Sequence, residues 1–343
     1  MRVAVFSTKP YTSQFLSAAN KEFGHELAFF EPRLTEQTAA LAGEFPVVCP
    51  FVHDVLNAAV LRLLQAGGVR LIALRCAGFN HVDLSATHQL GMTVMHVPAY
   101  SPYAVAEHTV GLMMALNRKL HRAYNRVRDG NFDLDGLLGF DMHGCTAGIV
   151  GTGKIGALVV RILHGFGMKI LVHDPNQNPD VVALGAKYVP LSELYAESDV
   201  ITLHCPLVPG TRHLIDAQAL AQMKDGVMLV NTSRGALVDT QAVIDALKSA
   251  KLGFMALDVY EEEEGLFFEN LSGQVLRDDV FARLLTFPNV IITAHQGFFT
   301  RTAMENIART TLQNIRDFEE GRAITNVITL ERVRPVAAAV KAP

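Results

Sequence analysis

Three closely spaced glycines give the first chemical signal in the chain. Gly151, Gly153 and Gly156 form a G-x-G-x-x-G pattern that follows the apolar run 146–150 and opens the apolar segment 157–166. In the order strand, turn and helix, the first glycine permits the tight turn, the second lets phosphates approach the backbone, and the third lets helix and strand pack closely. The pattern therefore predicts a dinucleotide site at a helix N-terminus. The alternative is a glycine-rich turn that binds nothing.

An acidic residue at the end of the next predicted strand indicates which nucleotide is bound. Asp174 follows the run 169–173, at roughly the 20-residue separation from the turn that is expected of a ribose-binding acid. A carboxylate at this place hydrogen-bonds a free 2′-hydroxyl and repels a 2′-phosphate. We therefore expect the cofactor to be NAD(H), with NADH preferred over NADPH.

Three further predicted strands end in side chains that could carry out a reaction. These are Arg234 after the run 227–231, the glutamates Glu261 to Glu264 after the run 254–258, and His295 after the run 290–294. Ligands bind outside the carboxyl ends of the strands in an open parallel sheet. The topology should therefore bring an arginine, a carboxylate and a histidine to the same edge as a bound nicotinamide.

These three residue types suit hydride transfer to or from a small carboxylic acid. The planar fork of Arg234 can hold a substrate carboxylate at two points and so fix the carbon that exchanges the hydride. His295 can protonate a carbonyl oxygen near neutral pH, or remove a hydroxyl proton in the reverse direction. A neighbouring carboxylate would stabilise the protonated imidazole and fix its orientation. Each residue alone has an ordinary structural explanation, whereas their joint placement favours an active site.

Length and composition favour a two-domain protein that binds small molecules. The chain has 343 residues, of which 50% are hydrophobic, so two domains with large cores are expected. The net charge of −4 argues against a nucleic acid partner. A basic cluster is interpreted as a solvated helix face or a subunit contact. It consists of Arg118, Lys119, Arg122, Arg126 and Arg128.

The cysteines and the hydropathy pattern point to a reducing compartment. Cys49, Cys76, Cys145 and Cys205 are scattered without C-x-x-C spacing, so we interpret them as reduced thiols. They show no metal-ligand spacing either, and no metal site is expected. The sequence has no basic and apolar leader and no apolar span of about 20 residues, which predicts a cytoplasmic protein without a membrane partner.

Two alternations of apolar runs and helical stretches organise the chain. In the first hundred residues, strands are expected at 2–6, 26–30, 47–52, 71–75 and 93–97. A second alternation begins at residue 146, contains the glycine turn and adds a strand at 200–204 to those named above. Both alternations indicate parallel sheets.

A long helix and a returning helix are expected to join these parts. Ser101 can cap and Pro102 can begin one helix that runs to about Arg128. Its apolar stripe consists of Val105, Thr109, Leu112, Leu116 and Leu120, and it suggests either an interface or a buried core helix. A helix at 302–318 should return to the first domain, and the tail 332–343 is expected to be mobile.

A family resemblance is carried by the segments 74–80, 97–100, 104–108, 231–235 and 258–261, together with the glycine turn and His295. In these segments the chain resembles the D-isomer-specific 2-hydroxyacid dehydrogenases, most closely the bacterial fermentative D-lactate dehydrogenases. The resemblance implies an NAD-dependent oxidoreductase that reversibly reduces pyruvate to D-lactate. It also implies an α/β fold of two doubly wound parallel-sheet domains with a cleft between them. These are a flavodoxin-like substrate domain (1–99 and 298–331) and a Rossmann NAD-binding domain (100–297).

The resemblance implies a role for each candidate side chain. Arg234 matches the arginine that binds the substrate carboxylate, His295 matches the acid/base, and Glu263 matches the partner of the histidine. Spacing alone leaves Glu262 and Glu264 open. The implied cofactor contacts are Gly151, Gly153, Lys154, Ile155, Gly156, Asp174, Cys205, Pro206, Thr211, Thr232, Ser233, Arg234 and Asp258. The implied substrate contacts are Phe51, Ala77, Gly78, Tyr100, Arg234, His295, Phe298 and Phe299.

The sequence leaves three questions open: the identity of the substrate, the number of chains in the assembly, and whether the protein is an enzyme at all. The aromatic substrate contacts mostly lack a hydroxyl group, which suits a compact apolar group such as the methyl of pyruvate. One alternative is a dehydrogenase for another small D-2-hydroxyacid. A second is an NAD(H)-sensing interaction protein of the same fold, because such proteins keep similar residues. The resemblance further implies a homodimer or a homotetramer.

Overall fold

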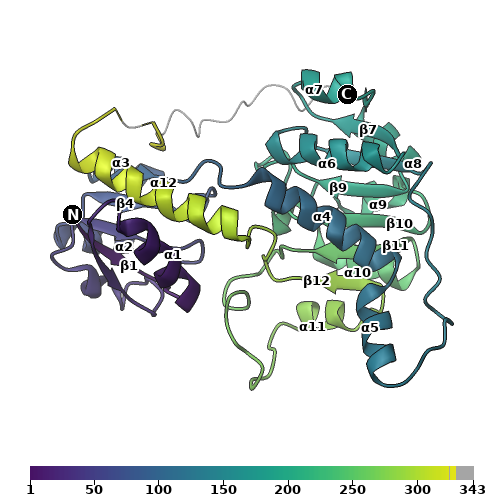
Figure 1. Cartoon of the computed structure of the whole chain (residues 1–343), viewed down its shortest axis with the longest axis horizontal. Coiled ribbons are helices and arrows are strands. Elements are labelled where there is room, and N and C mark those ends of the chain that lie inside the picture. The colour runs from purple at the N-terminus through teal and green to yellow at the C-terminus, as the bar shows by residue number, and fades with distance from the viewer. Residues whose placement is uncertain (324, 330–343) are drawn as a thin grey trace. The chain divides into compact units, whose positions relative to one another are not determined.

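The chain folds into two compact units (Figure 1), seen in a computed structural model that describes residues 1–323 and 325–329. Unit 1 consists of Met1–Ser101 and the described residues from Phe299 onward. The described part of unit 2 is Pro102–Phe298. Unit 1 is therefore discontinuous in sequence, with the described part of unit 2 inserted into it. The tail that was expected to be mobile, 332–343, lies outside the described residues.

Unit 1 is built on a parallel sheet of five strands in the order β2-β1-β3-β4-β5. The strands are β1 (Arg2–Val5), β2 (Glu26–Phe29), β3 (Val47–Cys49), β4 (Leu71–Ala73) and β5 (Thr93–Met95). This order is that of flavodoxin-like sheets. The structure confirms all five predicted strands, and each ends one to three residues before the predicted end.

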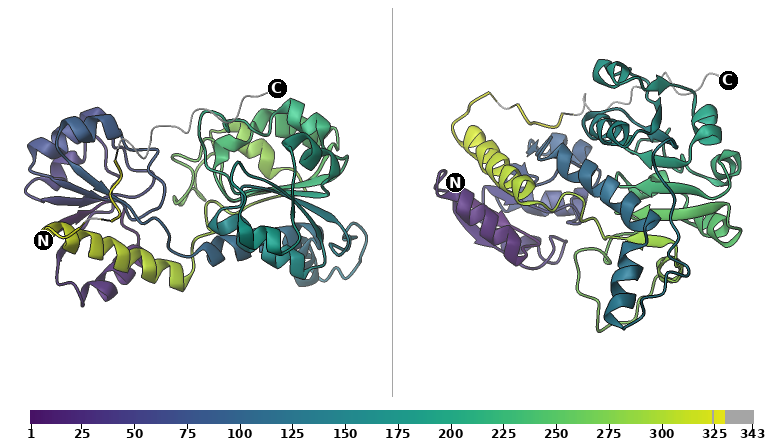
Figure 2. Two further views of the ribbon diagram at one scale, coloured as in Figure 1. Left: turned by 90° about the horizontal axis from the view of Figure 1, so that it is seen from above. Right: turned by 45° about the vertical axis from the view of Figure 1, so that its right-hand side comes forward.

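Helices cover both faces of this sheet (Figure 2). On one face, α1 (Pro10–Asn20) lies beside α12 (Arg301–Glu319), and both pack on a core that includes Leu16 and Leu312. On the other face are the 3₁₀ turn η1 (Ala39–Ala42) and the helices α2 (Ala58–Ala66) and α3 (Leu84–Gln89). The helix predicted at 302–318 is thus confirmed as α12, and it completes the core of unit 1.

The helix α12 forms because its sequence is capped and amphipathic. The Thr300 side chain accepts a hydrogen bond from the Ala303 amide at 3.3 Å and so satisfies the start of the helix. Buried residues recur at steps of three and four along it. They are Ala303, Met304, Ile307, Ala308, Thr311, Leu312, Asn314 and Ile315.

Unit 2 is built on a seven-stranded parallel sheet in the order β12-β11-β10-β9-β6-β7-β8. Its strands are β6 (Thr146–Val150), β7 (Lys169–His173), β8 (Lys187–Tyr188), β9 (Val200–Leu203), β10 (Val227–Asn231), β11 (Leu252–Leu257) and β12 (Val290–Ile292). This is the doubly wound order of dinucleotide-binding sheets, extended by one strand. The strand order reverses between β6 and β9, and the glycine turn follows β6.

Both faces of the unit 2 sheet are covered (Figure 2), which explains why its strands are continuous apolar runs. One face carries α4 (Pro102–Asn117), α6 (Lys154–Gly165) and α7 (Pro179–Ala183). The opposite face carries α8 (Leu191–Glu197), α9 (Ala217–Gln222), α10 (Thr240–Lys248) and α11 (Asp279–Leu285). The 3₁₀ turn η2 (Gly235–Leu237) precedes α10.

The prediction of one helix from Pro102 to about Arg128 is wrong. The chain forms α4 and then a separate helix α5 (Leu120–Arg128), and Lys119 between them has a left-handed backbone with φ 48°. The buried side chain of Asn117 donates to the Phe140 carbonyl and accepts from the Phe140 amide, both at 2.8 Å. These bonds fix the chain at the end of α4, so α5 departs in another direction. Leu120, predicted to belong to the apolar stripe, is 54% exposed.

Two smaller observations complete the fold. The strand β8 was not predicted, because two residues are too short to show a periodicity. Among the described residues, no helix is both long enough and apolar enough to cross a membrane.

Candidate active site

The glycine turn has the geometry that the sequence pattern predicts. Gly151 has φ 97°, and a Cβ there would lie 2.6 Å from the Cys205 amide nitrogen. A Cβ on Gly156 would lie 1.9 Å from the Gly151 carbonyl oxygen, so the helix could not approach the strand. A Cβ on Gly153 would meet nothing within 4 Å, which leaves open space in front of the turn. The first and third glycines thus serve close packing, and the second leaves room for a ligand.

The start of α6 is suited to bind an anion in that space. The helix begins at Lys154 and Gly153 is its N-cap, with no side chain capping it in the described structure. Uncapped amides and the helix dipole together favour a negatively charged group at this end. The turn therefore fits the pyrophosphate of a dinucleotide, with Lys154 and Ile155 next to it.

Asp174 lies beside this turn, at the end of β7. One of its carboxylate oxygens accepts from the Thr152 amide at 2.7 Å, and the other accepts from the Asn176 amide at 2.8 Å. A carboxylate has about four lone-pair positions, so both oxygens can still accept from a ribose hydroxyl. The Tyr188 hydroxyl of β8 donates to the Thr152 side chain at 2.9 Å and holds the same turn.

The segment after β10 orients Arg234 through a buried asparagine. Asn231 is fully buried, and its amide nitrogen donates to the Arg234 carbonyl at 2.8 Å. Its side-chain oxygen accepts from the Ser233 amide at 3.0 Å. The side chain of Ser233 donates to the Cys205 carbonyl at 2.8 Å and thereby joins the loops that follow β9 and β10.

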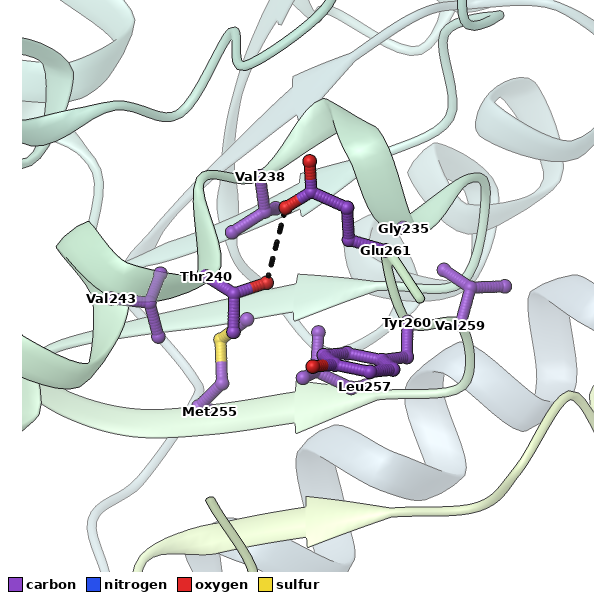
Figure 3. Close-up of a pocket in the computed structure, with 9 residues that line it drawn as sticks. All are labelled: Gly235, Val238, Thr240, Val243, Met255, Leu257, Val259, Tyr260 and Glu261. Atoms are coloured by element: carbon purple, nitrogen blue, oxygen red, sulfur yellow. Dashed lines mark hydrogen bonds between the residues drawn. The ribbon is translucent and has the colours of Figure 1, made fainter. Parts of the chain in front are cut away.

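Gly235 allows the arginine loop to pack directly on the loop after β11 (Figure 3). A Cβ on Gly235 would lie 2.0 Å from the carbonyl carbon of Tyr260, so no other residue fits without backbone movement. Beside this contact, the Thr240 hydroxyl donates to Glu261 at 3.5 Å. Glu261 also binds His213 at 2.6 Å and Arg212 at 3.1 Å. Glu261, the first of the four glutamates, thus ties the loops together.

The third glutamate, Glu263, faces the candidate acid/base. Its Oε1 lies 3.1 Å from Nδ1 of His295, and both side chains are 20% exposed. The other carboxylate oxygen accepts from the Tyr260 amide at 3.3 Å. Glu262 and Glu264 are exposed. The structure therefore brings Glu263 and His295 together, and Nε2 is left as the ring nitrogen that would exchange a proton with a substrate.

The loop that carries His295 is held by the buried carboxylate of Asp258. One oxygen accepts from the Thr293 hydroxyl at 2.6 Å and the Gln296 amide at 2.7 Å, and the other accepts from the Gly297 amide at 2.8 Å. His108 of α4 lies 3.0 Å from the Thr293 hydroxyl and 3.4 Å from Asp258. Since Thr293 donates to Asp258, His108 donates to Thr293.

These hydrogen bonds keep Asp258 ionised. Burial alone would raise the pKa of the carboxyl group, but the nearby His108 and the hydrogen bonds from Thr293 and Gly297 outweigh burial and lower that pKa below its usual value. The loop needs this support because Ala294 and His295 have left-handed backbones, with φ 50° and 61°. This conformation is unfavourable for residues that carry a Cβ.

The remaining cofactor candidates lie in the loops around this edge of unit 2. Cys205 is buried, and the Thr211 hydroxyl donates to the Pro206 carbonyl at 2.7 Å. The Thr232 hydroxyl lies 2.8 Å from that of Thr109 in α4. These hydroxyl groups therefore hold protein segments together, in addition to any contact with a cofactor.

The substrate candidates of unit 1 lie in loops after its strands. Ala77 and Gly78 follow β4, and the Ala77 carbonyl lies 2.9 Å from Nδ1 of His96. Phe51 follows β3, and the guanidinium of the buried Arg75 lies 4.9 Å from its ring centroid. The same guanidinium donates to the Cys49 carbonyl at 2.8 Å and the Phe6 carbonyl at 2.7 Å.

The other aromatic substrate candidates, Tyr100, Phe298 and Phe299, fall in different units. Phe299 of unit 1 is 44% exposed and its ring lies 4.9 Å from that of Tyr11. Tyr100 accepts a hydrogen bond through its carbonyl from Asn306 at 2.7 Å. Phe298 of unit 2 has its ring centroid 6.3 Å from that of His295.

Several residues that shape the site were not found from the sequence. They are Thr152, Tyr188, His108, Thr293 and Asn231. Except for Asn231, which bonds the adjacent Ser233 and Arg234, their contacts join segments that are far apart in the chain, so no local pattern could reveal them. His108 and Asn231 do lie in segments of the family resemblance, which was the one available signal.

A dinucleotide turn, a ribose-side acid and a paired histidine on one doubly wound sheet define an NAD-dependent oxidoreductase. Residues 110–297 match the family described as D-isomer specific 2-hydroxyacid dehydrogenase, NAD binding domain. The chain belongs to this family.

Similar proteins cover almost the whole chain. A 2-hydroxyacid dehydrogenase homolog of Haemophilus influenzae is 54% identical over 96% of this chain and 99% of its own length. The D-lactate dehydrogenase of Escherichia coli is 54% identical over 95% of this chain and 99% of its own length. The apo structure of D-lactate dehydrogenase from Escherichia coli matches with a TM-score of 0.89 and 52% identity, over 96% of this chain and 100% of that one.

The charge of Asp174 should set the cofactor preference. Asp174→Asn keeps an oxygen that accepts a backbone hydrogen bond but removes the charge that repels a 2′-phosphate. We expect the ratio of kcat/KM with NADH to kcat/KM with NADPH to fall about 10-fold. An unchanged ratio, or a wild type that uses both cofactors equally, would contradict this role of Asp174.

Asp258→Asn should destabilise the protein in a pH-dependent way. An amide cannot accept from both the Gln296 and Gly297 amides, so we expect a loss of about 1–3 kcal/mol at neutral pH. Because the folded pKa of Asp258 is lowered, its contribution is present above the usual carboxyl range and is lost as the pH falls through the folded pKa. The difference between variant and wild type in urea unfolding should stay constant from about pH 8 to 5 and shrink only below about pH 4. A difference that shrinks already above pH 5 would contradict the assignment.

Proposed function

We propose that the protein is a D-lactate dehydrogenase that reversibly reduces pyruvate with NADH. The observation that carries this proposal is the Glu263–His295 pair, whose side chains lie 3.1 Å apart. Glu263 follows β11, next to β10, which leads to Arg234, and His295 follows β12, next to β11. The relative of Escherichia coli that bears the name D-lactate dehydrogenase, at 54% identity, supports the choice of substrate. The D configuration of the product rests on the family alone.

Each residue of the site has a distinct part in this reaction. When bound, NADH supplies the hydride. The guanidinium of Arg234 grips the substrate carboxylate at two points and fixes the carbonyl carbon. His295, protonated and oriented by Glu263, donates a proton from Nε2 to the carbonyl oxygen, and it takes a hydroxyl proton in the reverse direction. Asp258 holds the loop of His295 through buried hydrogen bonds and is not itself the proton donor.

The same proposal assigns the binding residues. The pyrophosphate lies on Gly151, Gly153, Lys154, Ile155 and Gly156 of the turn, and Asp174 binds the ribose. Cys205, Pro206 and Thr211 contact the adenosine part, and Thr232, Ser233 and Asp258 lie near the nicotinamide. The substrate contacts are Ala77 and Gly78 through their amides and Phe51, Tyr100, Phe298 and Phe299 through their rings.

A steady-state panel of small 2-oxo acids with NADH tests the proposal. Pyruvate should give the highest kcat/KM, and chiral analysis of the product should show D-lactate. A higher value for a larger 2-oxo acid would replace pyruvate by another substrate of the same class. If NADH binds but no 2-oxo acid is reduced, the protein senses the cofactor instead of using it.

Substitution of Arg234 and of His295 should affect different steps. Arg234→Lys keeps a positive charge but loses the two-point grip, so we expect a higher KM and a lower kcat for pyruvate with NADH binding nearly unchanged. His295→Ala should reduce kcat on the order of 10²–10⁴-fold, because the general acid is lost. His164→Ala, at an exposed position in the last turn of α6, is the matched control. A near-wild-type kcat in His295→Ala would overturn the mechanism.

We further propose that two copies associate through α5 and the loop that follows it in unit 2. The apolar side chains there are unusually exposed: Leu120 54%, Tyr124 63%, Val127 54%, Phe132 74%, Leu134 78% and Leu138 86%. Exposed apolar patches of this kind mark interaction surfaces. The basic residues of α5 and the acidic residues Asp133 and Asp135 of the loop suit a two-fold contact, in which each helix meets the other copy's loop.

The four cysteines form no disulfide in the described residues, which supports a cytoplasmic location.

Light scattering at several concentrations tests this association. The wild type should have the mass of two chains or of four chains. The double variant Phe132→Asp and Leu138→Asp should shift to the mass of one chain, because it buries charge in the contact. Val182→Asp, at a 47% exposed position of α7 in the same unit, is the control. A wild type of single-chain mass would refute the association.

A further inference from the structure

A third ring joins His295 and Phe298 in unit 2. The ring of Phe268, in the loop after β11, has its centroid 5.7 Å from that of the His295 imidazole, at an interplanar angle of 40°. The Phe298 ring lies 6.3 Å from the imidazole and 6.5 Å from Phe268. The imidazole is therefore flanked by two aromatic rings while its Nδ1 faces Glu263.

The chain places Phe268 there through a tight turn that also carries Glu263. The amides of Leu266 and Phe267 both donate to the Glu263 carbonyl, at 3.2 and 3.1 Å. Phe267 is 3% exposed, and its ring packs 5.8 Å from Phe281 of α11. The turn is thus anchored in the core by Phe267, one residue before Phe268.

The backbone at Phe268 is left-handed, with φ 66°. The His295 that it contacts is left-handed as well, with φ 61°. This region is unfavourable for residues with a Cβ. Strained residues that meet at one point are a feature of functional sites, where surrounding contacts hold them in place.

We infer that Phe268 is a positioning residue for proton transfer, which holds the His295 ring in the plane where Nδ1 meets Glu263 and Nε2 meets the substrate. This inference rests on the proposed function. A rigid ring beside an imidazole restricts its rotation more than a flexible aliphatic side chain does, and the Phe268 ring lies 5.7 Å from the imidazole at a tilt of 40°.

Phe268→Leu keeps an apolar side chain and removes the ring, and Phe268→Tyr keeps the ring. We expect Phe268→Leu to lower kcat for pyruvate on the order of 10-fold, less than the 10²-fold that a 1 Å misplacement can cost. The KM for NADH and the melting temperature should stay close to wild type. The solvent deuterium isotope effect on kcat should rise, because proton transfer becomes slower. Phe268→Tyr should restore kcat to within about twofold of wild type.

A double-variant cycle with His295→Ala separates a positioning role from a structural one. If Phe268 acts through His295, Phe268→Leu should have no further effect on single-turnover rates once the imidazole is gone. An equal loss with and without His295, or no loss in the wild-type background, would overturn the inference. Val275→Ala, at an 88% exposed position of the same loop, is the control. A wild type that is inactive with every 2-oxo acid would instead refute the proposed function, and this inference with it.

Discussion

The geometry of the site depends on one buried carboxylate. Asp258 follows the end of β11, is 2% exposed, and collects hydrogen bonds from the loop that follows β12. Without these bonds the left-handed residues Ala294 and His295 would relax toward ordinary backbone conformations. Gly297 must be a glycine here, because a Cβ would lie 2.8 Å from an Asp258 oxygen. The position of His295, the proposed acid/base, is therefore set by Asp258, to which the proposal gives no part in proton transfer.

Around this carboxylate, close backbone contacts fix the other loops. Gly235 brings the loop that carries Arg234 against Tyr260, and Gly151 brings the glycine turn against Cys205. Neither contact would admit a side chain. The loops after four adjacent strands, β9 to β12, thus form one connected layer at the sheet edge. Ser233 links the loops after β9 and β10, Glu261 links the loop after β11 to Thr240 and His213, and Asp258 links it to the loop after β12. The sheet supplies the order of the loops, and these links set their relative positions.

Much of this arrangement could be predicted from local patterns. The glycine turn, Asp174, Arg234 and His295 each follow an apolar run, and the rule that ligands bind at strand ends places them together. Glu263 could not be chosen among its neighbours from spacing, because its direction depends on the turn that Phe267 anchors. The pairs of His108 with Thr293 and of Tyr188 with Thr152 join distant segments, so no periodic pattern in the sequence reveals them. The break after α4 was missed for the same reason, since Asn117 finds its partner at Phe140.

The two hydrogen bonds between Asn117 and Phe140 also separate α4 mechanically from the segment 118–139. They join the two ends of this segment, where α4 ends and the chain returns toward β6. Sequence changes within this segment are therefore expected to leave α4, and with it His108, in place. The surface proposed for association can therefore change in sequence without a shift of the helix that carries His108.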